Sequence, residues 1–410
     1  MRHFDGVDDR VSRLKPMRRS PGRALTAALL PLILVSACGG SAEGPAPTTK
    51  SSSSSAATSD SVTIGAVLPL TGGSAALGKD QQRGIALAVE EINAAGGIGG
   101  KELKVKVEDS ETTPVSAVQA ARKLVTVDKV PLIVGELLST NTIAVGKYTQ
   151  QAGVPLISPA TSSNDVGKIG DAVFSIQAPD SVAGKFTAGK LYTAGYRRIA
   201  TVAPNNSYGS NIATAVKQEF TRLGGTVTTA ILYTEGQPNY RAELDKLETS
   251  DAQMYVYASY EPDSVTILKN AFAMNLDAAR FFGIYTSAIA SGENLKAAAG
   301  QFGDDYPTVP GSEFAAAYKA KYPGDAPTQY SALAYDAVKF SADALDKAGD
   351  QTREAIRTSL QKIGRAGFTG ATGAIRLGSD NEREAQEYVL LKVGSNGSLD
   401  TVTSISGPKE

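Results

Sequence analysis

From residue 62 onward, short apolar runs alternate with amphipathic stretches, and this alternation limits the possible folds more than any other feature. The first run is Val62–Leu68, and the stretch after it places Ile85, Ala88 and Ile92 on one helical face. Further expected strands are Leu103–Glu108, Val130–Val134, Val154–Ile157, Arg198–Ala203, Thr226–Ile231, Gln253–Ala258 and Arg280–Ile284. Strands that alternate with helices form parallel sheets with helices on both faces. About ten strands over about 345 residues predict an α/β protein with two doubly wound sheets.

Residues 1–37 have the pattern of an export signal. Seven Lys and Arg residues precede an apolar run of 14 residues from Ala24 to Ala37. This run contains Pro31 and is shorter than the roughly 20 residues that a membrane-spanning helix needs. A basic segment, a short apolar core and small residues before a break are typical of a secretory signal peptide. Met17 stands directly before two arginines, so translation from Met17 would leave a shorter signal of the same kind.

The single cysteine of the chain stands where this signal ends. Val35-Ser36-Ala37-Cys38 resembles a bacterial lipobox, whose cysteine accepts a diacylglycerol and becomes the new N-terminus. The alternative interpretation is a signal peptide followed by an incidental cysteine. We expect a lipoprotein with acyl chains such as palmitate on Cys38, held at the outer face of the cell membrane, because two or three chains anchor firmly. Residues 38–61 are rich in Ser, Thr, Gly, Ala and Pro and predict a flexible tether.

The composition excludes several kinds of active site from the folded body. His3 is the only histidine and Cys38 the only cysteine, so the body has no internal disulfide, no histidine triad and no zinc site of Cys and His. Beyond the signal peptide remain 34 basic and 39 acidic residues, which do not form a basic surface of the nucleic-acid-binding type. We therefore expect no metal, no cofactor and no nucleic-acid partner. An exported enzyme that works with carboxylates, hydroxyls and lysines is the least favoured class.

Hydroxyl groups and tyrosines follow the predicted strands at the edge where doubly wound sheets bind ligands. Residues 135–142 and 158–165 are dense in Ser and Thr, and residues 204–209 and 259–262 each contain a tyrosine. Hydroxyls and free N–H groups at helix starts can bind an anion, although Ser and Thr are also the preferred helix caps. Two such clusters on one sheet predict a site for a small carboxylate, where each hydrogen bond contributes about 1.5–3 kcal/mol.

Several of these segments resemble one known family. Ile64–Gly72, Gly84–Gly100, Pro155–Thr161 and Tyr208-Gly209 are similar, in order and spacing, to the type I periplasmic binding proteins of the leucine/isoleucine/valine-binding family. The resemblance extends over residues 62–393. It implies the receptor of an ABC importer, a monomer outside the cytoplasmic membrane that closes on a small-molecule ligand and delivers it to a membrane permease. Three crossovers would join the two α/β lobes.

The resemblance also implies lobe boundaries and binding residues. Lobe 1 is expected to comprise residues 62–180 and 304–384, and lobe 2 residues 181–303 and 385–406. The family's carboxylate-binding serine corresponds to Ser139, and its Ala-x-Thr segment, which binds carboxylate and ammonium, to Ala160 and Ser162. The other corresponding positions are aromatic or apolar: Tyr208, Tyr260, Tyr330 and Leu77.

One position departs from the family pattern. Family members that bind amino acids have an acidic residue after the strand Arg280–Ile284, which pairs with the ligand ammonium, and this chain has Tyr285 there. A phenol cannot neutralise a buried ammonium, and an unpaired buried charge is costly. Either Asp180, Glu136 or Glu261 supplies the carboxylate, or the ligand lacks an α-amino group. In the second case, an aromatic acid, an amide or a keto acid fits the site, and the receptor could signal rather than import.

Two further features have open interpretations. Asp180 precedes a helix expected near Ser181, so its carboxylate could cap that helix instead of facing a ligand. The segment 297–310 is shorter than its counterpart in the family, with a consequence that the sequence does not define.

Overall fold

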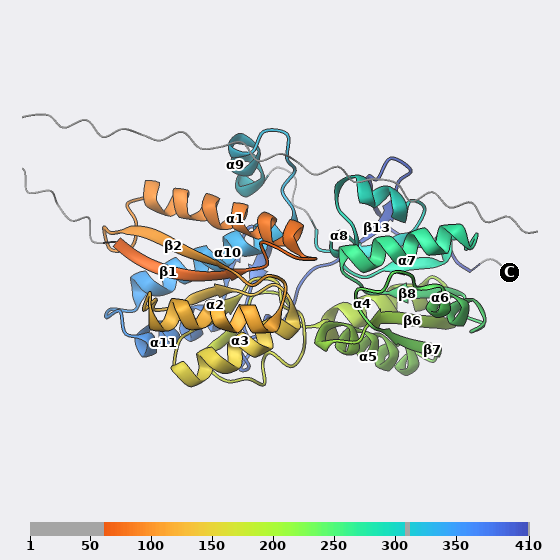
Figure 1. Cartoon of the computed structure of the whole chain (residues 1–410), viewed down its shortest axis with the longest axis horizontal. Helices are drawn as coiled ribbons and strands as arrows, with labels where there is room; N and C mark the ends of the chain where they lie inside the picture. The colour runs from red at the N-terminus through yellow and green to blue at the C-terminus, as the bar shows by residue number, and fades with distance from the viewer. Residues whose placement is uncertain (1–60, 308–311, 409–410) are drawn as a thin grey trace, which may run out of the picture. The chain divides into compact units, whose positions relative to one another are not determined.

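The computed structural model describes residues 61–307 and 312–408 (Figure 1). The predicted signal peptide, Cys38 and residues 308–310 of the short segment lie outside these ranges. Ser61 is the first residue of strand β1, so the predicted tether ends one residue earlier than expected.

The first sheet has five parallel strands in the order β2-β1-β3-β4-β5. Its strands are β1 (Ser61–Leu68), β2 (Glu102–Asp109), β3 (Ile133–Gly135), β4 (Leu156–Ser158) and β5 (Val173–Ser175). Its helices are α1 (Ala75–Ala94), α2 (Pro114–Thr126), α3 (Ser139–Ala152), α9 (Glu313–Lys321), α10 (Gln329–Lys347) and α11 (Arg353–Ala366). Successive strand residues point to opposite faces. Ile64 therefore packs with α1 and α10, whereas Val67 packs with α2 and α3 on the other face.

The second sheet has seven strands in the order β14-β13-β10-β9-β8-β6-β7. They are β6 (Arg198–Pro204), β7 (Thr226–Tyr233), β8 (Met254–Tyr257), β9 (Phe281–Gly283), β10 (Phe302–Asp305), β13 (Val389–Val393) and β14 (Leu399–Val402). Strands β6 to β10 are parallel to one another. β13 pairs with β10, and β14 pairs with β13, in the antiparallel orientation. Its helices are α4 (Asp180–Thr193), α5 (Ser207–Arg222), α6 (Arg241–Glu248), α7 (Glu261–Ala273) and α8 (Thr286–Ile289), with the 3₁₀ turns η1 (Ala278–Arg280) and η2 (Gly292–Ala298).

Helices again cover both faces of this second sheet. Ile199 of β6 packs in one cluster with α4 and α5, and Ala200 packs in another with α6 and α7. The chain passes to the second sheet after β5, returns after β10 and passes again before β13. The predicted α/β fold of two doubly wound lobes with three crossovers is thereby confirmed. None of the helices among the described residues is both long and apolar enough to span a bilayer.

Two of the expected lobe boundaries fall inside secondary-structure elements. Asp304 and Asp305 were assigned to lobe 1, but they belong to β10, which pairs with β9 in the second sheet. Asp180 was also assigned to lobe 1, and it is the first residue of α4, which packs on α5. The end of lobe 1 at residue 180 therefore moves back by one residue, because α4 begins at Asp180. The end of lobe 2 at residue 303 moves forward by two residues, because β10 ends at Asp305.

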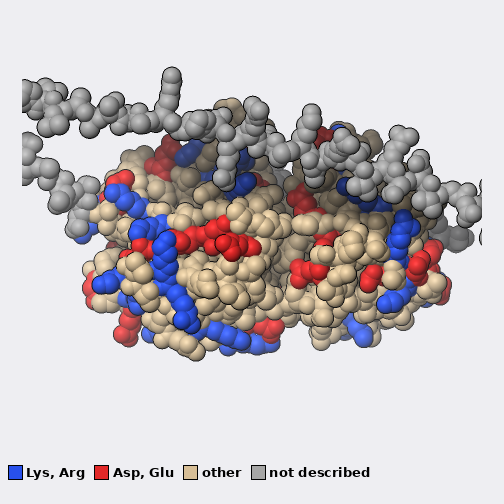
Figure 2. Space-filling model, in the orientation of Figure 1, with Lys and Arg blue, Asp and Glu red and all other residues tan. Residues whose placement is uncertain are grey.

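The surface carries charges of both signs. On the face shown in Figure 2, acidic and basic side chains occur close together rather than in separate fields. Several form ion pairs, such as Lys123 with Glu108 and Arg222 with Glu219, each at 2.6 Å.

The first and third crossovers run side by side, and Arg383 holds them on the first lobe. Ser175 forms a parallel bridge with Glu382, and the Ala178 N–H donates to Gln386 Oε1 at 2.8 Å. The Arg383 side chain is 2% exposed. Its guanidinium donates to the carbonyl oxygens of Ile176, Thr372, Ala374 and Ala385, at 2.7–3.3 Å. Thr372 and Ala374 lie in and beside the hairpin of β11 (Phe368–Gly370) and β12 (Gly373–Ile375).

Arg383→Met should destabilise the protein strongly. The substitution retains an unbranched side chain but leaves these buried carbonyl oxygens without their donor. We expect the free energy of unfolding to fall by about 3 kcal/mol or more, because hydrogen bonds to a charged group contribute roughly 1.5–3 kcal/mol each. Urea denaturation followed by circular dichroism measures the change. The control is Arg222→Met, whose side chain is 68% exposed and should matter little. Equal losses in the two variants would contradict the role of Arg383.

Candidate functional site

The predicted binding residues lie at helix starts and strand ends that meet between the two sheets. Ser139 begins α3, Tyr208 is the second residue of α5, and Tyr260 directly precedes α7. Seven of the eight residues are buried, with exposed fractions of 2–6%: Leu77, Ser139, Ala160, Ser162, Tyr208, Tyr285 and Tyr330. Tyr260 is partly buried. The structure thus places these side chains in the interior, and five of them belong to one buried cluster: Leu77, Ala160, Tyr208, Tyr285 and Tyr330.

The start of α3 offers free backbone donors. Ser139 is its first residue, so its N–H has no acceptor within the helix, and the helix dipole favours a negative charge there. The loop after β4 is held in place by Thr161. Its N–H donates to Ser158 Oγ at 3.1 Å, and its hydroxyl contacts that of Thr142. Because Thr161 is used inside the loop, the neighbouring Ala160 and Ser162 are the residues left to face a ligand.

Glu136 is a buried carboxylate whose two oxygens are already bonded. Ser110 Oγ donates to Oε1 at 2.5 Å, and the Leu138 N–H donates to Oε2 at 2.6 Å. Burial raises the pKa of Glu136 to about 7, although these hydrogen bonds lower it. Glu261 is similarly engaged, because Ser291 Oγ and Asn294 Nδ2 each donate to it at 2.7 Å. Neither carboxylate is free to receive a ligand ammonium.

Asp180 differs because one of its carboxylate oxygens has no partner. The residue is fully buried, and the Tyr285 hydroxyl donates to Oδ1 at 3.5 Å, whereas Oδ2 is buried and unpaired. Burial raises the pKa of Asp180 well above its usual range, and the hydroxyls of Ser162 and Tyr285 lower it. The expected alternative of a helix cap is wrong, since Pro179 occupies the N-cap position of α4 and Asn164 Oδ1, not Asp180, accepts from the Ser181 N–H at 3.1 Å.

Three tyrosine rings of the second lobe pack together beside Asp180. Tyr208 lies 5.3 Å from Tyr260 and 6.0 Å from Tyr285, between ring centroids. Burial raises the pKa of all three phenols well above the usual value, so each stays a hydrogen-bond donor. Tyr285 has left-handed backbone angles, φ 53° and ψ 66°, and its N–H donates to Asp304 Oδ1 at 3.2 Å. Such a conformation costs about 1–3 kcal/mol for a residue other than glycine and is common at functional sites.

Two more tyrosines join this cluster that sequence reasoning missed. Tyr306 and Tyr388 lie 5.4 Å and 6.3 Å from the Tyr285 ring and 5.1 Å from each other. They belong to the second and third crossovers. The sequence signal that would have found them is a tyrosine directly after β10 and another directly before β13, but β10 was not predicted as a strand.

Unpaired polar atoms are concentrated among these residues. Native proteins leave few buried polar atoms without a hydrogen bond. Here, the atoms of this kind beside the tyrosines are Asp180 Oδ2 and the Tyr208 hydroxyl, whereas the hydroxyls of Tyr306 and Tyr388 lie near that of Tyr285 and Gln329 Nε2 lies near Asp305. This set can receive a small polar molecule with donors and acceptors. Among the described residues, no group of three or more His, Cys, Asp or Glu side chains could hold a metal ion.

The two lobes are in contact beside the site. Asn211 Nδ2 of α5 donates to Ser163 Oγ and to Asp165 Oδ2, each at 3.1 Å. Ser163 and Asp165 follow β4 of the first lobe. These two bonds link α5 of the second lobe to the loop after β4 of the first lobe.

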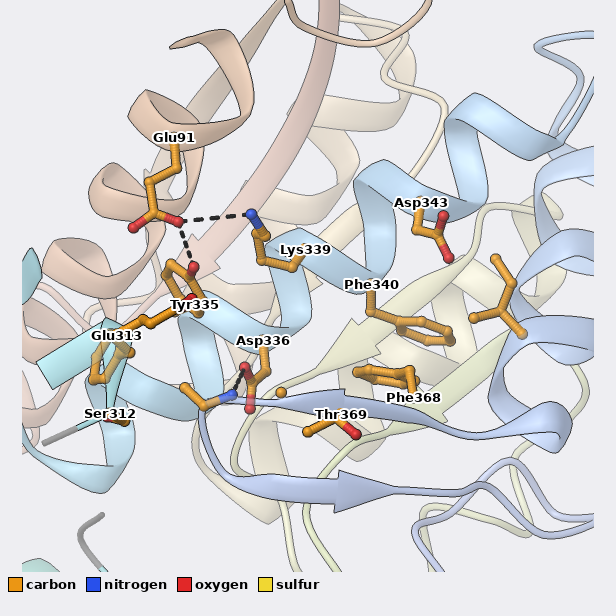
Figure 3. Close-up of a pocket in the computed structure, with 14 residues that line it drawn as sticks. Glu91, Ser312, Glu313, Tyr335, Asp336, Lys339, Phe340, Asp343, Phe368 and Thr369 are labelled. Carbon is orange, nitrogen blue, oxygen red and sulfur yellow. Dashed lines mark hydrogen bonds and ion pairs between the residues drawn. The ribbon is translucent and has the colours of Figure 1, made fainter. Parts of the chain in front are cut away.

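A separate pocket of about 560 Å³ lies on the first lobe and contains none of the predicted binding residues (Figure 3). It is formed by α1, α9, α10 and β11. Its charges are largely paired within the protein: Glu91 accepts a hydrogen bond from Tyr335 and lies 3.6 Å from Lys339, and Asp336 accepts from the Ala371 N–H at 2.6 Å.

Comparisons with known proteins concern nearly the whole described body. A family model described as periplasmic binding protein matches residues 61–398. The leucine-, isoleucine-, valine-, threonine- and alanine-binding protein of Pseudomonas aeruginosa is 29% identical over 315 residues, 74% of this chain and 82% of that protein. The amino acid binding protein of the same organism is 28% identical over 303 residues, 70% of this chain and 79% of that protein.

Solved structures show the same fold. The branched-chain amino acid transporter substrate-binding protein LivJ of Streptococcus pneumoniae, in complex with isoleucine, is 26% identical with a TM-score of 0.75, over 84% of this chain and 99% of that one. A solute-binding protein of R. palustris in complex with benzoate is 19% identical with a TM-score of 0.74, over 85% of this chain and 97% of that one, which shows the fold alone.

The raised pKa of Glu136 predicts a pH-dependent stability. Because the pKa is about 7 in the folded protein and lower in the unfolded chain, the folded state binds the proton more tightly. The free energy of unfolding should therefore fall as the pH rises from about 5 to about 8. Glu136→Gln, whose amide cannot ionise, should lose less stability over this range, as urea unfolding at each pH would measure. Parallel profiles of the two proteins would contradict the prediction, and Glu102→Gln, at an exposed position, is the control.

Proposed function

Because the chain belongs to the periplasmic binding protein family, we propose that it is the receptor of an ABC importer for an amino acid. The observation that carries this proposal is the unpaired Oδ2 of the buried Asp180. A buried carboxylate with a free oxygen is costly unless a cationic group pairs with it. The α-ammonium of an amino acid is such a group, and this favours an amino acid over the deaminated acids that the Tyr285 departure left open.

The ligand carboxylate is proposed to bind at the end of the site opposite to Asp180. Ser139 supplies its hydroxyl and the free N–H at the start of α3, and Ala160 and Ser162 supply the neighbouring loop. Hydrogen bonds to a carboxylate are stronger than neutral ones, so a few of them can anchor a small acid.

The tyrosines of the second lobe are proposed to cover the bound ligand. Tyr208 offers an unpaired hydroxyl, Tyr260 packs on its ring, and Tyr285 orients Asp180 through its own hydroxyl. Leu77 and Tyr330, from α1 and α10, would border the ligand side chain. A monomeric receptor is part of this proposal, as the family resemblance implies.

Delivery to a membrane permease is proposed from the relatives. The two relatives from Pseudomonas aeruginosa are named as amino acid binding proteins, and LivJ is named as part of a branched-chain amino acid transporter. A ligand that pairs groups from both lobes stabilises the closed arrangement. The closed receptor would then be the form that the permease recognises outside the membrane. The family is one of solute-binding proteins, and we propose no catalytic activity.

Two substitutions test the two ends of the site separately. Calorimetry compares each amino acid that binds with its deaminated analogue. We expect Ser139→Ala to weaken both compounds by at least about tenfold, because both carry the carboxylate. Asp180→Asn should weaken the amino acid by at least about tenfold and leave the analogue nearly unchanged, because only the amino acid carries the ammonium.

Ligand binding to the wild-type protein is measured first. An amino acid at a hundred times its Kd should stabilise it by about 2.7 kcal/mol, which a thermal shift detects. Tighter binding of the deaminated analogues than of the amino acids would contradict the role of Asp180. Thr140→Ala is a matched control for Ser139→Ala, because it removes a hydroxyl from the neighbouring, exposed position of α3.

We also propose that Cys38 carries the lipid anchor, on the basis of the signal peptide and the lipobox-like sequence. The expected result is that the full chain fractionates with membranes when expressed in a bacterium that processes lipoproteins. Cys38→Ser should release it into the soluble extracytoplasmic fraction, detected by immunoblotting. Ser36→Ala, which keeps a small residue in the signal, is the control. Membrane fractionation that is unaffected by Cys38→Ser would contradict the anchor.

A further inference from the structure

Gln81 is a buried side chain whose amide is unpaired at both ends. It is 0% exposed, and neither Oε1 nor Nε2 has a hydrogen-bond partner. A carboxamide offers two donors and an acceptor, and leaving all of them unmet in the interior is unfavourable. Gln81 is also absent from the set of residues that the sequence assigned to the ligand.

Gln81 lies on the face of α1 that packs against the loop after β1 and the first turn of α10. Residues 78, 81 and 84 lie along the buried face of α1, because residues three apart are neighbours on a helix. A β-carbon at Gly78 would lie 2.0 Å from the Pro69 carbonyl oxygen, and one at Gly84 would lie 1.9 Å from that of Ser331. Gln81, between these two close contacts, therefore points inward at the junction of the two elements.

Other unpaired polar atoms come from elements at the same junction. Gln329 is the first residue of α10, and its buried Nε2 faces only the Asp305 carboxylate and the Tyr330 hydroxyl, without a hydrogen bond of ordinary length and angle to either. Tyr330 follows it, and burial raises the pKa of its phenol, with smaller increases from Asp305 of β10 and Asp80 of α1 and a decrease from Gln329. The Tyr306 hydroxyl, in the second crossover, is also unpaired. Gln81 lies one turn after Leu77 on the same face of α1, and Gln329 directly precedes Tyr330 on α10, so both amides adjoin residues expected to border the ligand side chain.

The charged groups at this junction are already engaged. Asp305 accepts from the Ser287 N–H at 2.7 Å and from the Tyr306 N–H at 2.9 Å. Asp80 lies 3.9 Å from Arg83, in an ion pair. The groups left unmet are therefore neutral amides and a phenol, which match a neutral polar partner better than a charged or an apolar one.

We propose that Gln81 and Gln329 bind the side chain of the ligand, and that this side chain carries a neutral carboxamide. The inference rests on the proposed function, because it takes the ligand to be an amino acid held by Ser139 and Asp180. A carboxamide supplies an acceptor for Gln81 Nε2 or Gln329 Nε2 and a donor for Gln81 Oε1. An apolar side chain of the same shape would leave these atoms unpaired, and a site built to hydrogen-bond its ligand discriminates against such an analogue.

The test compares isosteric amino acids by calorimetry on the purified protein. The pairs are asparagine with leucine, and glutamine with homoleucine, which differ in polarity but little in shape. We expect the amide member of at least one pair to bind at least tenfold more tightly. Gln81→Leu should reduce that preference at least tenfold. It should also raise the Tm of the protein without added ligand, because it removes an unpaired buried amide.

A matched control variant and the wild-type measurements distinguish failure of this inference from failure of the proposed function. Gln82→Leu changes the neighbouring glutamine, which is exposed, and should leave the preference unchanged. Leucine and homoleucine binding at least as tightly as their amide isosteres would overturn the inference and leave the proposed function in place. Failure of every amino acid to bind would overturn both. If Gln81→Leu does not fold, the isosteric pairs on the wild-type protein still decide.

Discussion

The hydrogen bonds of the buried Arg383 guanidinium determine where the two lobes can be joined. They connect the third crossover to Ile176 of the first crossover and to the β11–β12 hairpin. Both crossovers are consequently fixed to the first lobe up to these residues. The freedom that remains lies farther along each crossover, near Ala178 and Gln386, which are linked by a single hydrogen bond.

This arrangement places the crossovers next to the ligand site rather than at a distance from it. Tyr306 and Tyr388 belong to crossovers, and both pack on the ring of Tyr285. Asp304, at the end of β10, accepts from the Tyr285 N–H and so helps to hold its left-handed backbone. A displacement of the lobes would change the packing around Tyr285 and therefore the environment of Asp180, to which its hydroxyl donates. Binding and lobe movement share the same side chains.

The sequence predicted those parts of the fold whose signal is local. The long strands β1, β2, β6 and β7 and the amphipathic helices follow from apolar periodicity, and the parallel sheets follow from their alternation. Strands β5, β11, β12, β13 and β14 were missed. β11 and β12 each contain a glycine and only one large apolar residue, Phe368 and Ile375, so their apolar signal is weak. Strand β10 was missed because Asp304 and Asp305 are typical of a loop, and only burial against α4 and α8 makes them part of a strand.

The candidate site was predictable to a similar degree. The resemblance selected eight positions, and the structure places them at helix starts and strand ends, mostly buried. It did not select Gln81, Tyr306 or Tyr388, because their relevance depends on contacts between segments far apart in the chain. The choice among Asp180, Glu136 and Glu261 was also beyond the sequence, since all three are acidic residues near predicted helix starts. Only the hydrogen bonds of each carboxylate separate them.

The unpaired atoms at the lobe junction bear on both stability and function. A closed arrangement that buries Asp180 Oδ2, the Tyr208 hydroxyl and the Gln81 amide without partners is less stable than one in which a ligand pairs them. Under the proposed function, the ligand removes this disadvantage at several atoms at once, and it does so only when both lobes contact it. The free energy that favours closure then comes from the ligand rather than from the lobe contacts. A receptor whose lobes closed equally well alone would present the same surface to a permease whether loaded or empty, and the polar interior prevents this.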